Sequence, residues 1–222
     1  MSYVPGWSML RRAIVSMYTV FLMFNSHTLR SRLDRVIDTN HGTVRGLVRA
    51  MLAQTEFVLG RLEDHTRPAG QHIDRLVFVC LGNINRSAFA EQAARQLGAA
   101  TCSIGLSTTT GAPAFHKAVA TAPQFKLDLL QHRATDMSDY RLQPRDLLLA
   151  MEIRHVRRLM AAGIPARSIA LLGHWASPHR IHLHDPHVLS DAYFRTCFTL
   201  IHSAVGGLVH ELRAVSSPCV TR

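Results

Sequence analysis

The stretch from Cys80 to Ser87 carries a thiol and a guanidinium, Cys80 and Arg86, with five residues between them. The apolar run Leu76 to Val79 leads into it and a segment of helical period leads out, which predicts a strand, a phosphate-binding loop and a helix. Backbone N–H groups of such a loop converge on one centre, where Arg86 can grip a tetrahedral dianion at two points. The helix N-terminus and Arg86 favour a thiolate, and Ser87 can donate a hydrogen bond to its sulfur. The pattern suits nucleophilic attack on phosphorus, but the spacing of Cys80 and Arg86 alone favours the alternative of a buried cysteine that ends a core strand.

The sequence VCLGNINRSAFAE, from Val79 to Glu91, resembles the signature of the low-molecular-weight protein tyrosine phosphatase family, in its bacterial form. The residues in matching positions are Gly82, Asn83, Ile84, Arg86, Ser87, Ala90 and Glu91. The signature departs at Asn85, where many members carry a second cysteine, and at Ala88, where proline is common. Neither change removes a group that the chemistry needs. The resemblance implies that Cys80 and Arg86 are catalytic and that the substrate phosphate binds on Leu81, Gly82, Asn83, Ile84, Asn85 and Ser87.

The resemblance also assigns roles to residues farther along the chain. Asp185-Pro186 precedes an amphipathic segment, Ser190 to Leu212, and is similar to the family's D-P loop, whose aspartate is the general acid. Ser103 matches a serine that braces the loop asparagine, and His132 matches a further brace for Asn83. On spacing alone, Ser103 would be a turn residue at a strand end and His132 an ordinary surface or core histidine.

One wall of the family's active site is altered in this chain. Thr109 stands where an aromatic residue is usual, and His187 and Val188 stand where another aromatic often follows Pro186. Because aromatic walls grip a phenyl ring, we expect weaker selection for phosphotyrosine than the family name implies. The alternative is that another aromatic side chain supplies the wall, the candidates being Tyr140 and Trp175.

Apolar runs that alternate with helix-period segments predict a parallel α/β sheet. The predicted strands are Leu76 to Val79, Thr101 to Leu106, Asp146 to Met151 and Ser168 to Leu172. The family resemblance implies a four-stranded parallel flavodoxin-like sheet with helices on both faces, whose ligands bind outside the carboxyl ends of the strands. Cys80 is predicted to lie at such an end. The final segment carries Cys197 on its apolar face, which predicts a buried, inert thiol.

We divide the chain into a helical N-terminal extension and linker at 1–71, a phosphatase-like domain at 72–215 and a tail at 216–222. The extension contains an apolar run, Ala13 to Phe24, that is too short to span a bilayer. It is read as a plain helix, as a membrane-surface segment, or as upstream sequence included by a misassigned start codon. Between Thr43 and Leu62 apolar residues recur at helical spacing. This face is expected to pack on the domain or on another copy, with membrane or partner binding as the alternative, so the extension reads as an appendage rather than part of the chemistry.

A net charge of +10 favours anionic partners, among them phosphorylated substrates, nucleic acid and acidic membranes. No nucleic-acid motif or aromatic-rich basic patch accompanies the charge, so the sequence argues against a nucleic-acid role. Four widely spaced cysteines suggest neither disulfides nor zinc, which fits a reducing cytoplasm, with peripheral attachment at the inner membrane face if the extension binds lipid. Five histidines lie from His174 to His187, including the pair His182 and His184. They are expected to form a partly charged rim, and we predict neither a metal nor a cofactor.

The expected substrate is a phosphorylated protein or a small phosphomonoester. Bacterial members of the family often act on tyrosine kinases that control polysaccharide export, so the resemblance suggests such a kinase as a partner. Two alternatives share the fold. An arsenate reductase needs further redox cysteines, but no cysteine lies between Cys102 and Cys197. A catalytically silent phosphate-binding module would be expected to lose Cys80, Arg86 or Asp185, and all three are present.

Overall fold

The computed structural model describes residues 29–66 and 73–216. The predicted apolar run Ala13 to Phe24, the end of the predicted linker and almost all of the C-terminal tail lie outside these residues.

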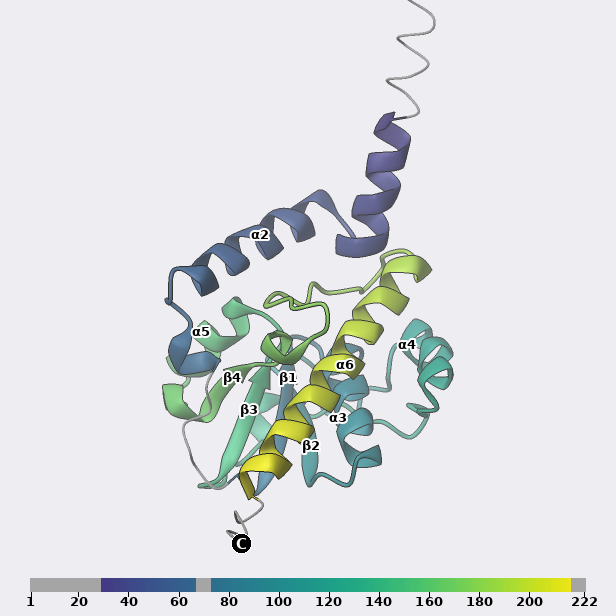
Figure 1. Ribbon diagram of the computed structural model, residues 1–222. Coiled ribbons are helices and arrows are strands. Elements are labelled where there is room, and N and C mark those ends of the chain that lie inside the picture. The colour runs from purple at the N-terminus through teal and green to yellow at the C-terminus, as the bar shows by residue number, and fades with distance from the viewer. Residues whose placement is uncertain (1–28, 67–72, 217–222) are drawn as a thin grey trace, which may run out of the picture.

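The four predicted strands form one parallel sheet in the order β2-β1-β3-β4 (Figure 1). Their bounds are Arg75–Cys80 for β1, Thr101–Gly105 for β2, Asp146–Ala150 for β3 and Ile169–Leu171 for β4. The two central strands are apolar and almost wholly buried, as is usual where helices cover both faces of a parallel sheet. Cys80 is the last residue of β1 and pairs with Gly105, the last residue of β2. The predicted position of the thiol at a carboxyl end is therefore confirmed.

Alternate residues of each strand enter two separate cores, because successive side chains point to opposite faces of the sheet. Helices α3 (Arg86–Gln96), α4 (His116–Thr121) and α6 (Asp191–Ser216) pack on the core that contains Phe78 and Leu149. Helix α5 (Ile153–Ala161) and part of α2 (Val44–Val58) pack on the core that contains Val79 and Leu148. Short 3-10 turns complete the fold at Glu63–His65, Ala122–Phe125, Met137–Asp139, Ala166–Ser168 and Leu172–Trp175. The predicted layered α/β architecture is confirmed.

The extension crosses the top of the domain in the view of Figure 1. Residues 29–41 are helical, and α2 follows after a turn at Gly42 and Thr43. Of the two expected partners for the apolar face of α2, the domain is wrong, because that face is exposed, and another copy of the chain stays a prediction; the exposed members are Val44, Val48, Met51, Leu52 and Val58. The opposite face packs instead, through the buried residues Gly46 and Ala53. Small side chains let a helix approach its neighbour closely, which explains why the face with Gly46 and Ala53 packs on the domain.

A polar cluster is enclosed where β3 leads into α5. Glu152 and His155 are fully buried, and His182 from the loop before α6 is 5% exposed. Burial lowers the pKa of His155 to about 3 and that of His182 to about 4. Their Nε2 atoms lie 3.7 and 3.8 Å from the Glu152 carboxylate, so near neutral pH these are contacts between a carboxylate and neutral rings. His182 therefore does not belong to the charged histidine rim expected from the sequence.

We predict that the free energy of unfolding falls as the pH drops from about 6.5 to about 4. Unfolded histidines titrate near pH 6.5. The folded state keeps His182 neutral until about pH 4, so the unfolded state binds more protons in this window and acid favours it. The loss attributable to His182 is on the order of 3 kcal/mol. Urea unfolding across this range should show a weaker pH dependence for His182→Gln, and no change for His210→Gln, since His210 is exposed. An unaltered slope for His182→Gln would contradict the assignment.

Candidate active site

The loop that follows β1 wraps around the sulfur of Cys80. Cys80 Sγ lies 2.9 Å from Ser87 Oγ and 3.2 Å from the backbone nitrogen of Asn83, which donates to it. The carbonyl oxygens of Cys80 and Leu81 are turned outward, where they accept hydrogen bonds from the backbone that follows β2. Helix α3 begins at Arg86, so its N-terminus faces the same loop. The arrangement matches the strand, loop and helix predicted from the sequence, with a positive helix end beside the thiol.

Asn83 adopts a left-handed conformation, with φ of 51°. Asparagine tolerates this region better than most residues, but it still has a conformational cost, which neighbouring contacts must offset. Its side-chain nitrogen donates to Ser87 Oγ at 2.9 Å and to Ser103 Oγ at 2.7 Å. Its side-chain oxygen accepts from the backbone nitrogen of Thr135 at 2.8 Å. The loop therefore holds its strained residue by both ends of the amide.

Both residues expected to brace Asn83 lie against it. Ser103 Oγ also donates to the buried Glu91 carboxylate at 2.6 Å, which fixes the direction of the hydroxyl. His132 Nε2 lies 2.7 Å from the Asn83 carbonyl oxygen. Burial lowers the pKa of His132, which favours a neutral ring that donates through Nε2 to that carbonyl. Glu91 matched the family signature, but only the structure reveals that it anchors Ser103.

Arg86 is almost completely buried and meets two carboxylates. Its Nη1 donates to Glu152 at 2.6 Å and to the Leu183 carbonyl at 2.8 Å. Its Nη2 lies 2.8 Å from Asp185 Oδ2. Burial opposes the charge of Arg86, but Asp185 and Glu152 outweigh it and raise the pKa of the guanidinium above its usual range. Sequence reasoning missed Glu152, because an acidic residue after a buried strand is not a recognisable signal.

The structure brings Asp185 to the rim of the loop. Its carboxylate is partly exposed, and one oxygen accepts from the His187 backbone nitrogen at 3.2 Å. The His187 ring packs on Phe115, with centroids 4.5 Å apart, and approaches the Asn85 side chain at 3.5 Å. Asp185, which is far from Cys80 and Arg86 in the sequence, therefore shares one site with them. Of the remaining loop residues, Leu81, Gly82 and Ile84 stay partly exposed, whereas Asn85 and Ser87 are buried.

Neither aromatic candidate for the missing wall lies at this site. Tyr140 donates to Asp146, the first residue of β3, at the opposite end of the sheet from Cys80. Trp175 donates through its indole nitrogen to Glu211 of α6. Thr109 itself is exposed. The aromatic residue that does border the loop is Phe115, whose backbone nitrogen donates to the Ile84 carbonyl at 3.0 Å, and sequence reasoning overlooked it.

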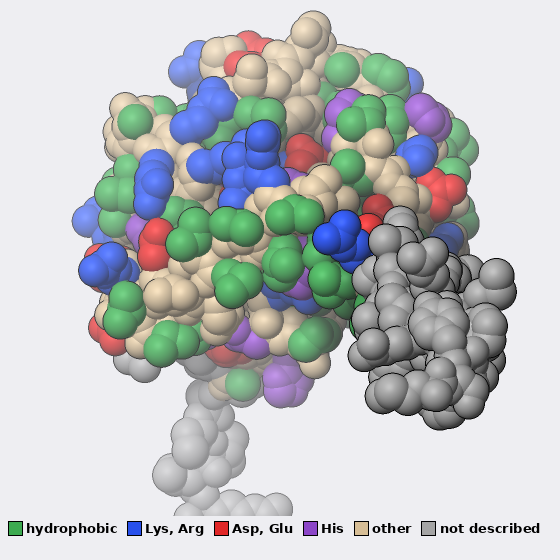
Figure 2. All heavy atoms as spheres, turned by 90° about the horizontal axis from the view of Figure 1, so that it is seen from above, with side chains coloured by type: hydrophobic (Ala, Val, Ile, Leu, Met, Phe, Trp, Pro, Cys, Tyr) green, Lys and Arg blue, Asp and Glu red, His purple; other side chains and the backbone are tan. Residues whose placement is uncertain are grey.

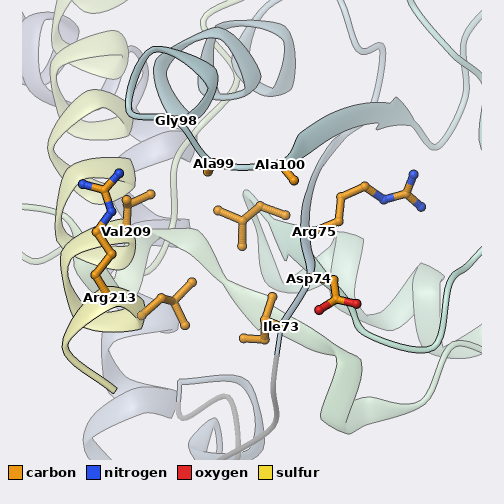
Figure 3. Close-up of a pocket in the computed structure, with 10 residues that line it drawn as sticks. Ile73, Asp74, Arg75, Gly98, Ala99, Ala100, Val209 and Arg213 are labelled. Atoms are coloured by element: carbon orange, nitrogen blue, oxygen red, sulfur yellow. The ribbon is translucent and has the colours of Figure 1, made fainter. Parts of the chain in front are cut away.

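Other candidate centres are remote from this site or unsuited to it. Cys102 pairs with Val77 in the sheet, three residues before Cys80, and Cys197 is buried in α6 with its pKa raised by burial to about 12. Across residues 29–66 and 73–216, histidine, cysteine and acidic side chains form no group of three or more that could hold a metal. A pocket of about 180 Å³ lies near the start of β1 and the end of α6, far from the thiol (Figure 3). No described cysteine, serine or threonine lines it; its lining includes Ile73, Asp74, Arg75, Ala99, Val209 and Arg213.

Comparisons with known proteins point to one family. Residues 75–217 match the family described as low molecular weight phosphotyrosine protein phosphatase. The chain is 31% identical over 144 residues to the low molecular weight protein-tyrosine-phosphatase Wzb of Salmonella typhi, covering 64% of this chain and 95% of that protein. It is 29% identical to the probable phosphatase EpsP of Ralstonia solanacearum, covering 64% of this chain and 99% of that protein.

Solved structures agree with this assignment. The tyrosine phosphatase Wzb of Escherichia coli K30, in complex with sulphate, has a TM-score of 0.56 and 28% identity, covering 64% of this chain and 99% of that one. Wzb of Vibrio vulnificus, in complex with benzylphosphonate, has a TM-score of 0.55 and 26% identity, covering 63% and 99%. From residue 75 onward, this chain belongs to the low molecular weight phosphotyrosine protein phosphatase family.

Proposed function

We propose that this chain hydrolyses phosphomonoesters, with phosphotyrosine in proteins as the main class, through a phosphocysteine on Cys80. The observation that carries the proposal is the position of Cys80 Sγ, which has the Ser87 hydroxyl and the Asn83 N–H within hydrogen-bonding distance at the N-terminus of α3. Such contacts stabilise a thiolate more than a thiol. Membership of the phosphatase family supports the same chemistry.

In the first step the Cys80 thiolate attacks phosphorus, a sulfur–phosphorus bond forms and the bond to the leaving oxygen breaks. Loop N–H groups and Arg86 hold the non-bridging oxygens, while Asp185 gives its proton to the leaving oxygen. In the second step water attacks phosphorus and passes a proton to Asp185, and the thiolate leaves as the free nucleophile. Because Arg86 and fixed backbone dipoles bear the charge, this route calls for no metal and no cofactor.

Ser103 and His132 are proposed to act on this chemistry through Asn83. The Asn83 side-chain nitrogen donates to Ser103 Oγ, and the Asn83 carbonyl oxygen accepts from His132 Nε2. These two hydrogen bonds keep the left-handed turn in place. That turn aims the Asn83 N–H at the sulfur. Loss of either brace would therefore disturb the nucleophile without removing a reacting group.

Two other functions are less well supported. A silent phosphate-binding module does not need Asp185, yet its carboxylate lies on the loop arginine. An arsenate reductase passes electrons between neighbouring thiols, but Cys102 lies beside Val77 in the sheet and Cys197 is buried in α6. We infer that the substrate is a phosphorylated protein, with a bacterial tyrosine kinase as the first candidate on family grounds.

The proposed reaction predicts that Cys80→Ser abolishes phosphate release while the protein still folds and binds phosphate. Serine keeps the size of the side chain, but its hydroxyl is a far weaker nucleophile at neutral pH. Phosphate release should be measured on a panel of aryl phosphates, phosphopeptides and sugar phosphates, with Cys102→Ser as the matched control. Wild-type turnover in Cys80→Ser would refute the mechanism, and an inactive Cys102→Ser protein would show that serine substitution itself is harmful.

The exposed Thr109 predicts a modest preference for phosphotyrosine. A phenyl ring between aromatic walls gains about 0.5–1.5 kcal/mol for each ring pair, roughly three- to tenfold in affinity. Thr109→Trp should therefore lower KM for a phosphotyrosine peptide by roughly this factor and leave turnover of a small alkyl phosphate unchanged. Thr110→Val, at the next position of the same loop, serves as the comparison. An unchanged KM in a folded Thr109→Trp protein would count against the missing wall.

We also propose that the outward face of α2 attaches the enzyme to an anionic membrane surface. Val44, Met51 and Val58 are each more than 60% exposed. Figure 2, which looks down on the extension, shows hydrophobic side chains gathered on this side with basic side chains beside them. Arg45 and Arg49 lie on the same helix, and the chain carries a net charge of +10. No helix among the described residues is long and apolar enough to cross a bilayer, so the attachment proposed is interfacial.

Membrane attachment predicts that the full-length protein sediments with vesicles containing phosphatidylglycerol more than with pure phosphatidylcholine vesicles. Met51→Glu should reduce binding at least severalfold, because a carboxylate interrupts the apolar face and repels the anionic surface. Met160→Glu is the matched control, since Met160 is 45% exposed on α5. Failure to bind, together with a concentration-dependent dimer that Met51→Glu abolishes, would show instead that this face joins two copies of the chain.

A further inference from the structure

The loop that carries Asp185 is held on one side by the phosphate loop. Arg86 contacts Asp185 Oδ2 and the Leu183 carbonyl, each at 2.8 Å. The backbone nitrogen of Leu183 donates to the Met151 carbonyl at 3.0 Å, which ties the loop to the end of β3. These contacts fix the residues before the acid, and the Tyr193 hydroxyl of α6 donates to the His184 carbonyl at 3.1 Å; the opposite side of His184 faces the N-terminal extension.

The N-terminal extension holds that opposite side. Thr43 Oγ1 lies 3.4 Å from His184 Nε2, and the same oxygen caps α2 by accepting from the Gly46 nitrogen at 2.9 Å. Gly46 is tightly enclosed, because an added Cβ would lie 2.2 Å from the His41 carbonyl oxygen of the extension and 2.7 Å from the His184 imidazole ring. The first turn of α2 therefore rests on the residue next to Asp185.

The extension also contacts both flanks of the loop. Before the acid, the Arg180 guanidinium donates to the Asn40 carbonyl. After it, an added Cβ at Gly42 would lie 2.6 Å from both Leu189 and Tyr193. Gly42 has a φ of 73°, so its conformation as well as its surroundings favours glycine. Residues 40–46 consequently enclose the acid loop from a side that the phosphate loop does not reach.

We propose that residues 40–46 position the general acid: they hold the Asp185 loop against Arg86, so that its carboxyl meets the leaving oxygen. This inference rests on the proposed role of Asp185. The family match begins at residue 75, and the relatives are matched over 95% and 99% of their own lengths, so this brace lies outside the region they share with the chain. It is a positioning element added to a complete phosphatase domain.

The effect of a positioning element on the acid has a distinctive signature. A misplaced proton donor slows the departure of a basic leaving group, whereas an acidic leaving group departs without full protonation. Partial unfolding would lower the rate for both substrates by the same factor. The ratio of kcat/KM for phenyl phosphate to kcat/KM for p-nitrophenyl phosphate therefore separates a positioning role from a structural one.

The test uses full-length Thr43→Val and Gly46→Ala proteins. For each we expect kcat/KM to fall about tenfold with phenyl phosphate and about twofold or less with p-nitrophenyl phosphate. Thr43→Ser keeps the hydroxyl and should behave as wild type. Thr55→Val makes the same exchange as Thr43→Val on the exposed face of α2 and should leave both rates unchanged. Equal losses with both substrates, or no loss with either, in folded Thr43→Val and Gly46→Ala would overturn the proposal.

Asp185→Asn shows whether a failed test concerns the brace or the proposed role of Asp185 on which it depends. It should show the largest leaving-group dependence, and adding Gly46→Ala to it should not increase that dependence, because the acid is already lost. If Asp185→Asn itself shows no leaving-group dependence, the role of Asp185 in the proposed function is wrong. If Asp185→Asn shows the dependence and the brace variants do not, the brace alone is rejected.

Discussion

The buried positive charge of Arg86 constrains the rest of the site. A guanidinium removed from water is unfavourable by several kcal/mol unless carboxylates and hydrogen-bond acceptors surround it. Here Glu152 comes from the end of β3, Leu183 offers a carbonyl from the acid loop and Asp185 adds the second carboxylate. Two segments that are distant in the sequence, the end of β3 and the acid loop, are thereby drawn to one side chain. The charge proposed to grip phosphate also organises the domain around it.

The two carboxylates on Arg86 differ in a way that suits their proposed tasks. The Glu152 side chain is 1% exposed and also pairs with Arg154, so it is a permanent counterion. The Asp185 side chain is 27% exposed and lies on a loop. A phosphate dianion on Arg86 would repel both carboxylates, but only Asp185 has solvent beside it into which it can move. Proton transfer to a leaving group needs such a displaceable carboxyl, whereas a stable arginine needs one that stays.

Local features of the chain could be predicted from sequence, and long-range ones could not. The strand, loop and helix around Cys80 follow from an apolar run and a motif whose parts are adjacent. The four strands follow for the same reason. Glu152 and Phe115 were missed because their importance depends on packing between segments, which leaves no local pattern. The family resemblance supplied Asp185, Ser103 and His132 where spacing alone would not have.

The orientation of α2 is a second feature that could not be predicted from the sequence. Helical periodicity predicts that a helix has an apolar face, but it does not predict which face meets the domain. At Gly46 an added Cβ would meet the His41 carbonyl oxygen and the His184 ring, and Ala53 is buried on the same face.

The orientation of α2 also affects how the loop that carries Asp185 is supported. On the phosphate-loop side, the acid loop is held through Arg86, whose partners change as phosphate binds and leaves. A second support, built from the capping hydroxyl of Thr43, the His184 imidazole and close backbone contact, does not involve Arg86 and is insensitive to that change. It can therefore keep the loop in place at the moment when its ionic partner is shared with substrate.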